Sequence, residues 1–351
     1  MITKKKSKTE KFVELKKQFD QIERIGQGTF SRVYRAREIS TGKIVALKRI
    51  FPTSSPTKIL REMEIIHEIR GSDTVCSLLG GCRHEDQITL IMSYFPTDDF
   101  KDFFHEINVK QIAQYMVAIL RSLAHIHSKN IVHRDVKPGN FLYCVESGKG
   151  MLIDFGLAQY VSDIELIEKT QKEEMKMMKK KMERRREKNK KISSNNRSRD
   201  RRPPLRAPRA GTRGFRSPEI LFKSTKQTTS IDIWSAGVML LSFLSGRYPF
   251  FHPEDDLTAL AELIALFGTK RIERIGKMLD RNLYYDKIQK GVPLKKLCKI
   301  NNLNFKEMNI PNSAFDLLER LLELDYRKRL TAEEALKHPF CQLAYKKYSL
   351  K

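Results

Sequence analysis

The stretch HRDVKPGN at residues 133–140, followed by DFG at residues 154–156, decides how this chain of 351 residues is interpreted. It supplies carboxylates at Asp135 and Asp154 and an amide at Asn140. Phosphoryl transfer needs a carboxylate that orients the attacking hydroxyl, and oxygen ligands for the metal ions that bridge the phosphates. The residue types and spacing therefore predict Asp135 and Asn140 as catalytic residues, with Asn140 and Asp154 as metal ligands.

Each of these residues also has a simpler structural interpretation. Asp and Asn form turns by bonding their own backbone, and for His133 we favour a packed structural role. The flanking sequence decides the matter, because a helix-like apolar run at 112–126 precedes Asp135 and an apolar segment at 151–153 precedes Asp154. The second segment is typical of a short buried strand. The two motifs therefore belong to ordered loops of a folded core.

The combined pattern H-R-D-x-x-x-x-N with D-F-G resembles the catalytic core of the eukaryotic protein kinases. The resemblance implies an α+β fold with two lobes, a small β-rich lobe with one regulatory helix and a larger, mainly α-helical lobe. We assign residues 19–95 to the small lobe, residues 96–345 to the large lobe and residues 1–18 to a basic tail. ATP and Mg²⁺ are the implied cofactors.

Two upstream segments extend this resemblance. Residues 25–33 read G-x-G-x-x-S-x-V from Gly26 onward, and the two glycines would let backbone amides approach phosphate. VALK at 45–48 follows one strand and turn later, and it predicts Lys48 as the partner of the α- and β-phosphates. The ATP-binding residues predicted from these segments are Ile25, Gly26, Gln27, Gly28, Thr29, Phe30, Ser31, Val33, Ala46 and Lys48.

The lysine needs an acidic partner on the next helix, which the apolar spacing predicts around residues 58–66. Glu62 fits best by resemblance to other kinases, and Glu64 is the alternative. After a further strand at 88–92, the segment Ser93-Tyr94-Phe95 resembles the hinge whose backbone bonds adenine. Met92 would then stand beside the adenine pocket, although methionine also serves as ordinary core filling.

The residue pattern also indicates which hydroxyl is phosphorylated. Lys137, two residues after Asp135, resembles the lysine of serine/threonine kinases that steadies the transferred phosphate, and we count it as catalytic. Thr212 stands where those kinases carry a threonine that contacts the catalytic loop. We assign Thr212, Arg213 and Arg216 to the substrate groove, with a structural role for Arg216 as the alternative.

Downstream residues predict the frame of the large lobe. Residues 231–241 are apolar on nearly all sides, which is typical of a fully buried helix ending at Gly246. By resemblance, Asp232 braces the catalytic loop from beneath. Glu219 of the SPE motif and Arg329 are expected to form a buried ion pair.

A basic insertion is the main departure from an average kinase. Sixty residues separate Gly156 from Ser217, which is long for a loop in a compact domain. Residues 161–210 carry 18 Lys and Arg against 8 Asp and Glu, a net charge of +10 within a chain of +25. The spacing over 164–192 is compatible with a solvated helix, and the composition of 193–208 is typical of disorder.

Composition sets further limits. The five cysteines show no metal-ligand spacing, and no signal peptide or membrane-length apolar run is present, so we expect a reduced intracellular protein without a membrane anchor. Basic blocks occur at residues 4–8 and 179–191. Nuclear import and simple solubilisation explain them equally well, and direct DNA binding is less favoured.

Several longer stretches resemble the cell-division-cycle-seven kinases, the catalytic subunits of the Dbf-four-dependent kinases. The most specific are NFLY at 140–143 and GFR at 214–216, and the resemblance extends over about residues 19–340. It implies a nuclear enzyme that phosphorylates Ser or Thr in acidic contexts on the MCM helicase, promotes the initiation of DNA replication, and needs a Dbf-four-type activator subunit. Ser217 and Arg213 depart from the commoner alanine and proline.

Three other functional classes are the alternatives to this family. A catalytically dead scaffold would usually lack Lys48, Asp135 or Asp154, and all three are present. A nucleic-acid-binding protein would owe its affinity to the insertion at 161–210. A cyclin-dependent or mitogen-activated type kinase is the main alternative within the enzyme class.

Overall fold

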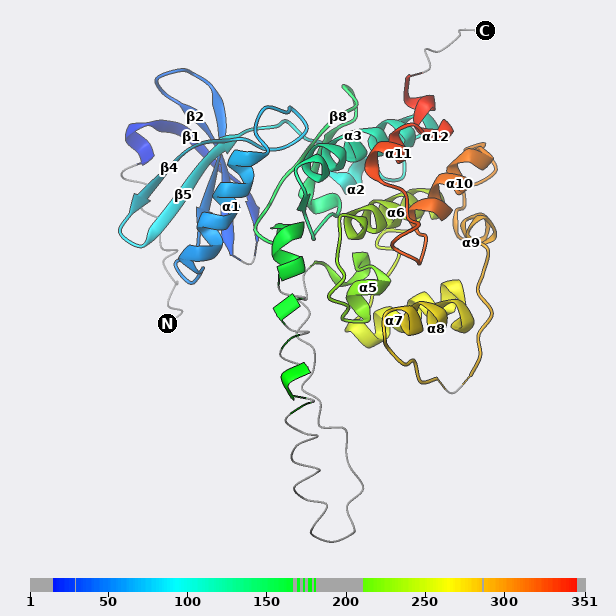
Figure 1. Cartoon of the computed structure of the whole chain (residues 1–351). Helices are drawn as coiled ribbons and strands as arrows, with labels where there is room; N and C mark the ends of the chain where they lie inside the picture. The colour runs from blue at the N-terminus through cyan, green and yellow to red at the C-terminus, as the bar shows by residue number, and fades with distance from the viewer. Residues whose placement is uncertain are drawn as a thin grey trace, which may run out of the picture. The chain divides into compact units, whose positions relative to one another are not determined.

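The computed structural model describes residues 15–28, 30–166, 169–170, 173, 176–178, 180, 211–285 and 287–345. The chain divides into two compact units, residues 1–96 and 97–351. The first is rich in strands and the second is mainly helical (Figure 1). This composition confirms the predicted α+β fold class.

The first unit is built on a five-stranded antiparallel sheet in the order β1-β2-β3-β5-β4. Its elements are a 3₁₀ turn η1 (Leu15–Lys17), β1 (Phe19–Gln27), β2 (Ser31–Glu38), β3 (Ile44–Ile50), α1 (Pro56–Glu68), β4 (Leu78–His84) and β5 (Gln87–Ser93). Side chains alternate between the two faces of a strand. In β3, Val45 and Leu47 are accordingly buried on one face, and Ala46 and Lys48 lie on the other.

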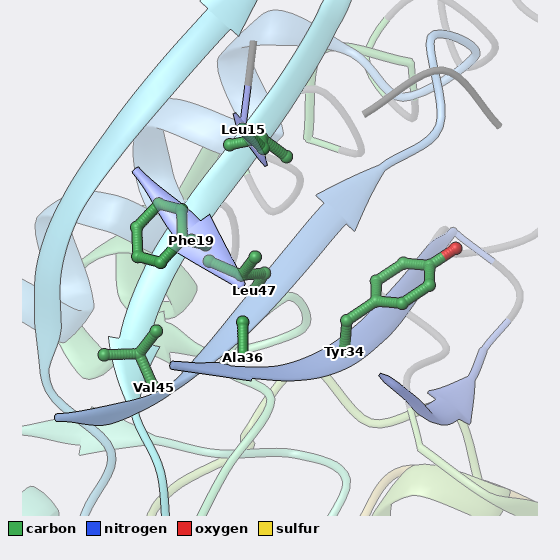
Figure 2. Close-up of a cluster of buried hydrophobic side chains, with 6 residues drawn as sticks. All are labelled: Leu15, Phe19, Tyr34, Ala36, Val45 and Leu47. Atoms are coloured by element: carbon green, nitrogen blue, oxygen red, sulfur yellow. The ribbon is translucent and has the colours of Figure 1, made fainter. Parts of the chain in front are cut away.

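The buried face of this sheet carries an apolar cluster (Figure 2). Tyr34 and Ala36 of β2 meet Val45 and Leu47 of β3, and Phe19 at the start of β1 closes the cluster together with Leu15. Phe19 is only 1% exposed, so residues near the start of the first described range already contribute to the core. The cluster fixes one face of the sheet and leaves Lys48 on the opposite face.

Helix α1 is the single α-helix among the described residues of the first unit. It begins at Pro56, a residue suited to the first turn because its missing N–H would have no helical partner there. The buried side of α1 is formed by Ile59, Glu62, Ile65 and Ile66. A glutamate thus occupies a position that the helical pattern would otherwise give to an apolar residue.

The second unit is formed mainly of helices, with short two-stranded sheets β6-β9 and β7-β8. Its helices are α2 (Phe100–Phe103), α3 (Val109–Ser128), α5 (Pro218–Leu221), α6 (Ser230–Ser245), α7 (Asp256–Phe267), α8 (Thr269–Met278), α9 (Leu294–Asn301), α10 (Asn312–Leu321), α11 (Ala332–Leu336) and α12 (Pro339–Gln342). Its strands and 3₁₀ turns are β6 (Ile131–Val132), η2 (Pro138–Asn140), β7 (Phe141–Cys144), β8 (Lys149–Leu152), β9 (Gln159–Tyr160), η3 (Arg213–Phe215) and η4 (Leu343–Tyr345).

Helix α6 is the centre of this unit. Every residue from Ser230 to Ser245 is buried, which confirms the prediction of a helix that is surrounded on all sides. Gly246 ends α6 in the left-handed conformation with φ of 65°, where a residue without Cβ is favoured. Helices α3, α9 and α10 pack against α6.

The insertion begins as a helix at residues 161–166. Ile164 is only 3% exposed and packs with Val132, Ile220 and Ile231. The interpretation of residues 164–192 as a solvated helix is therefore wrong at Ile164, which shares one face with Val161 and meets the core. The described residues from 165 to 180 are helical and exposed, as that interpretation predicts. The segment 193–208, predicted to be disordered, lies outside the described residues, as do the basic blocks at 4–8 and most of 179–191.

No helix in the described ranges combines the length and apolar character needed to cross a lipid bilayer. All five cysteines are described and carry free thiols. Burial raises the pKa of the Cys298 and Cys341 thiols to about 12, so both stay protonated at neutral pH.

Candidate active site

In the first unit, Lys48 of β3 and Glu62 of α1 form an ion pair with Nζ and Oε1 2.5 Å apart. The two side chains are 11% and 8% exposed. The alternative partner, Glu64, is exposed and pairs with Arg61 instead. The predicted pair is thus present, and the choice between the two glutamates is settled in favour of Glu62.

The strand register places the other predicted nucleotide-binding residues around Lys48. Val33 of β2 lies opposite Lys48, and Met92 of β5 lies opposite Ala46. Directly paired residues of neighbouring strands share a face of the sheet, so these four side chains belong to the face opposite the cluster of Figure 2. Met92 is 7% exposed.

The glycine-rich segment forms the turn between β1 and β2. Gly28 donates its N–H to the carbonyl of Ser31 at 2.9 Å, and Gly26 pairs with Val33. A Cβ added at Gly26 or Gly28 would make only ordinary contacts at 3.8 and 3.9 Å. Packing within the chain therefore does not require glycine here, whereas close approach of phosphate oxygens to the backbone would. This open turn fits ATP.

The remaining predicted residues of the nucleotide site lie at this turn and at the end of β5. Ile25 and Phe30 are 49% and 60% exposed, and Ser31 is buried. Thr29 lies outside the described residues, and Gln27 ends β1. Ser93 ends β5, where its hydroxyl accepts from Ser77 N–H, and the half-buried Tyr94 and Phe95 follow it.

In the second unit, the Asp135 carboxylate is held by four donors. Oδ1 accepts from the backbone N–H and the hydroxyl of Thr212, both at 2.8 Å. Oδ2 accepts from Lys137 Nζ at 2.8 Å and from Asn140 Nδ2 at 2.9 Å. The three predicted catalytic residues therefore form one hydrogen-bonded group, and Thr212 joins it from a segment 77 residues away.

The backbone of this loop is held from below by the buried Asp232 of α6. Its carboxylate accepts the backbone N–H groups of His133 and Arg134, each at 2.8 Å, and lies 3.0 Å from His127 Nε2. The ring of His133 accepts the Asp135 N–H at Nδ1, so Nε2 carries the proton that it donates to the Ile153 carbonyl. His133 also makes an edge contact with Phe155. The predicted structural roles of Asp232 and His133 are confirmed.

Arg134 is 6% exposed and contacts two neutral amides. Its Nη1 donates to Gln159 Oε1 at 2.7 Å and its Nη2 donates to Gln227 Oε1 at 3.3 Å. Burial lowers the pKa of the guanidinium to about 10, while Asp232 favours its charged form. Arg134 is therefore still a cation at neutral pH, and it ties the catalytic loop to β9 and to the segment before α6.

Gly211 is required by a close approach to the catalytic loop. Its φ of 91° is a conformation that residues with side chains rarely adopt, and a Cβ there would lie 2.4 Å from the Arg134 carbonyl oxygen. Only glycine lets the next residue, Thr212, reach Asp135. This constraint could not be read from the sequence motif alone.

The predicted magnesium ligands lie together. The backbone N–H of Ile153 donates to the carbonyl of Asn140 at 2.9 Å, which brings Asp154 beside Asn140. The Asn140 amide nitrogen bonds Asp135, so its oxygen Oδ1 is the atom that would bind a cation. Asp154 is exposed and has a φ of 64°. Magnesium binds one or two protein oxygen ligands together with phosphates and water, so these two residues fit it. Among the described residues there is no group of three or more His, Cys, Asp or Glu that would enclose a metal.

The three predicted groove residues differ in exposure. Thr212 and Arg213 are exposed, and Arg213 Nη1 donates to the Glu254 carbonyl. Arg216 is half-buried, donates to the Gly211 carbonyl at 2.7 and 3.0 Å, and pairs with Asp256. These bonds favour the structural alternative for Arg216, so Arg213 is the cation available to a substrate.

The arrangement suits transfer of a phosphoryl group to a hydroxyl. The Asp135 carboxylate is a positioned acceptor for a hydroxyl proton, and Lys137 places a positive charge 2.8 Å from it, where charge on the transferring group would develop. Bound ATP and magnesium would supply the phosphoryl group and neutralise its charge. The catalytic roles of Asp135, Lys137 and Asn140 stay predictions.

Sequence reasoning missed the residues that fix Arg134. Gln159 lies three residues after the DFG motif, but its amide was given no task, and Gln227 lies in no motif at all. His127, which bonds Asp232, was also missed. A buried cation needs partners, and that requirement alone would have prompted a search for the residues around Arg134, without identifying them.

The hydroxyl of Thr212 is expected to matter for catalysis. It donates to Asp135 and accepts from Lys137 Nζ at 2.7 Å, so it links the two catalytic side chains. We expect Thr212→Val to lower kcat by about tenfold, since a hydrogen bond to a charged group is lost. Steady-state kinetics on a serine peptide measures this, and Thr212→Ser should retain most of the activity. Equal kcat in the valine variant would contradict the assigned role.

Comparison with known proteins agrees with this geometry. The protein kinase domain family matches residues 19–341. The chain is 40% identical over 324 residues to a probable cell division control protein 7 homolog 1 of Encephalitozoon cuniculi, covering 91% of this chain and 90% of the relative. It is 34% identical to the cell cycle serine/threonine-protein kinase hsk1 of Schizosaccharomyces pombe, covering 97% and 76%. It is 26% identical to the human cell division cycle 7-related protein kinase, covering 91% and 88%. The chain therefore belongs to the protein kinase family and, within it, to the serine/threonine kinases of the cell division control protein 7 type.

Proposed function

We propose that this chain is the catalytic subunit of a Dbf-four-dependent kinase, which transfers the γ-phosphoryl group of ATP to Ser or Thr in acidic segments of the MCM helicase and thereby promotes the initiation of DNA replication. The observation that carries the proposal is the similarity over about nine-tenths of both chains to a relative named for cell division control. The activator subunit, the helicase substrate and a nuclear location come from the family resemblance of the sequence.

The preference for acidic segments is supported by the charge around the substrate hydroxyl. Lys137 bonds Thr212, and the exposed Arg213 follows Thr212 in the chain. Among the described residues Arg213 forms no ion pair, and Asp255 is the carboxylate that interacts with its charge. A carboxylate or phosphate next to the phosphoacceptor would meet this guanidinium. Arg213 stands where a proline is common in the family, so this cation is a feature of the present chain.

The decisive experiment is purification of the kinase from its native cells, followed by identification of the protein that co-elutes. Phosphorylation of an MCM tail is then measured for the complex and for the chain alone. The proposal predicts turnover by the complex and a loss of about a hundredfold or more without the partner. Full activity of the isolated chain would exclude an obligatory activator.

Peptide arrays separate this proposal from a cyclin-dependent or mitogen-activated type kinase. The proposal predicts efficient phosphorylation when Asp, Glu or phosphoserine follows the phosphoacceptor, and Arg213→Ala should reduce that preference. The matched control is Lys226→Ala, which removes an exposed cation outside the groove. A strict requirement for proline after the phosphoacceptor would overturn the proposed substrate class.

A further inference from the structure

A second basic surface lies on the second unit, apart from the catalytic group. It consists of α8 and the loop that follows it, and we call it the α8 surface. Lys270, Arg274 and Lys277 are exposed at spacings of four and three residues, so they share one side of α8. Lys287 and Lys290 of the loop are exposed as well.

The loop lies directly along α8, which brings the two sets of cations together. Lys290 forms a β-bridge with Gly268, and Gln289 exchanges hydrogen bonds with Thr269. Tyr285 Oη lies 3.3 Å from Glu273 Oε2, one turn further along the helix. Loop and helix therefore run antiparallel, and their exposed lysines form one surface.

Among the described residues, most of these cations have no ion-pair partner. Within the described ranges, Lys277 is paired with Glu273 at 2.6 Å, whereas Lys270, Arg274, Lys287 and Lys290 form no ion pair. The same surface exposes apolar side chains, with Tyr284 89% exposed and Ile288 63% exposed. Cations beside exposed apolar side chains fit a protein segment that carries both acidic and apolar residues. The apolar side chains would have no partner on a nucleic-acid backbone.

Helix α7 links this surface to the substrate groove. Its first residue, Asp256, pairs with Arg216, and it ends at Phe267, just before α8 begins at Thr269 (Figure 1). The exposed residues Leu257, Ala261 and Ala265 recur every four positions and form an uncharged stripe along the helix. Leu257 is 77% exposed. A peptide leaving the groove would thus follow an apolar path to the lysines.

The length of α7 sets the reach that a substrate needs. Its twelve residues span about 18 Å at a rise of 1.5 Å per residue. An extended peptide covers that distance with about five or six residues. Glu254 and Asp255 lie exposed at the groove end of α7 beside Arg213, so a tract of several acidic residues would gain less there than at the α8 end.

We propose that the α8 surface is a docking site for an acidic segment of the protein substrate, separated from the phosphorylated residue by at least about six residues. The inference rests on the proposed function as a kinase of acidic protein segments. Docking would raise the local concentration of the phosphoacceptor at the groove. Because the cations are exposed, the effect should weaken as the ionic strength rises.

The test uses peptides that contain one serine followed by an aspartate, and a block of glutamates joined to this pair by a Gly/Ser spacer. In one series the spacer and block are on the carboxyl-terminal side of the serine, and in the other they are on its amino-terminal side. Kinetics are measured on the active kinase, with its activator where one is required. We expect a spacer of about eight residues to lower KM about tenfold in one series relative to a peptide with a serine block. A two-residue spacer should give no gain, because it is too short for the path along α7.

The variant Lys270→Ala/Lys287→Ala/Lys290→Ala should remove this advantage while leaving kcat and KM for the peptide without a tail unchanged. The matched control is Lys296→Ala/Lys299→Ala, which removes exposed cations of α9 outside the α8 surface. An equal KM for tailed and untailed peptides with the unaltered kinase would overturn the docking proposal.

Loss of binding to a labelled DNA duplex in the triple variant, with no change in peptide KM, would assign the surface to nucleic acid instead. Failure to phosphorylate even the untailed acidic peptide would count against the proposed function and not against docking alone.

Discussion

Replacement of Asp135 by asparagine is expected to lower the rate of phosphoryl transfer by about a thousandfold, within the range found when a positioned acid–base group is lost. The carboxylate now accepts from Thr212, Lys137 and Asn140 through two oxygens. An asparagine amide has only one oxygen that can accept from these donors, and its NH₂ group would face the remaining donors without forming a hydrogen bond. It also removes the negative charge that would attract the substrate proton.

The measurement pairs phosphate transfer with ATP affinity. Single-turnover transfer to a serine peptide should collapse, whereas ATP binding, followed by titration calorimetry, should stay within about threefold because Lys48 and Glu62 are untouched. The matched control is Asp280→Asn, at an exposed turn with φ of 59° where asparagine is equally well accommodated. Substantial transfer by the Asp135 variant would refute its catalytic role.

Removal of the Glu219 carboxylate is expected to destabilise the protein by about 3–5 kcal/mol. Glu219 of α5 and Arg329 are 1% and 0% exposed in their side chains and form a two-point pair at 2.8 and 3.2 Å. Arg329 also donates to the carbonyls of Ser230 and Glu323, and it lies over the Trp234 ring. In Glu219→Ala a buried guanidinium would keep its charge and lose its only carboxylate partner among the described residues.

Thermal unfolding followed by circular dichroism should show the melting temperature falling by about 10 °C or more. Arg320→Ala is the control, because it breaks an exposed pair with Asp316 and should change stability by less than about 1 kcal/mol. The double variant Glu219→Leu/Arg329→Met should recover part of the loss, since no unpaired charge remains. A Glu219→Ala protein with the same melting temperature as the wild type would show that this pair does not stabilise the unit.

The ion pairs show how far local sequence reasoning reached. Lys48–Glu62 and Glu219–Arg329 were predicted from motifs 14 and 110 residues apart in the chain, and both are present. Each pair combines residue types whose burial requires a partner of opposite charge. A charged residue in one motif therefore predicts its partner in another motif, however far apart the two lie in the sequence. The roles of the predicted nucleotide and magnesium residues remain predictions, although their placement fits those ligands.

Exposed and loop positions were less predictable. Arg213 and Arg216 are equivalent as sequence signals. In the structure Arg216 donates to the Gly211 carbonyl and pairs with Asp256, whereas Arg213 is exposed. The insertion looked solvated from residue 164 onward, yet Ile164 is buried. In both cases the deciding neighbour comes from a distant segment, and its position depends on the packing of the whole unit.

The sequence by itself determined the chemistry, because a carboxylate, a lysine and an amide at the spacing of residues 135–140, followed by Asp154, suit phosphoryl transfer wherever the loop is held. Only the tertiary structure decided what holds that loop. Asp232 receives its backbone N–H groups, two glutamine side chains contact Arg134, and Gly211 lets Thr212 reach Asp135. These contacts join residues up to 99 positions apart. They depend on close packing and on the need of buried polar groups for partners, which no local pattern encodes.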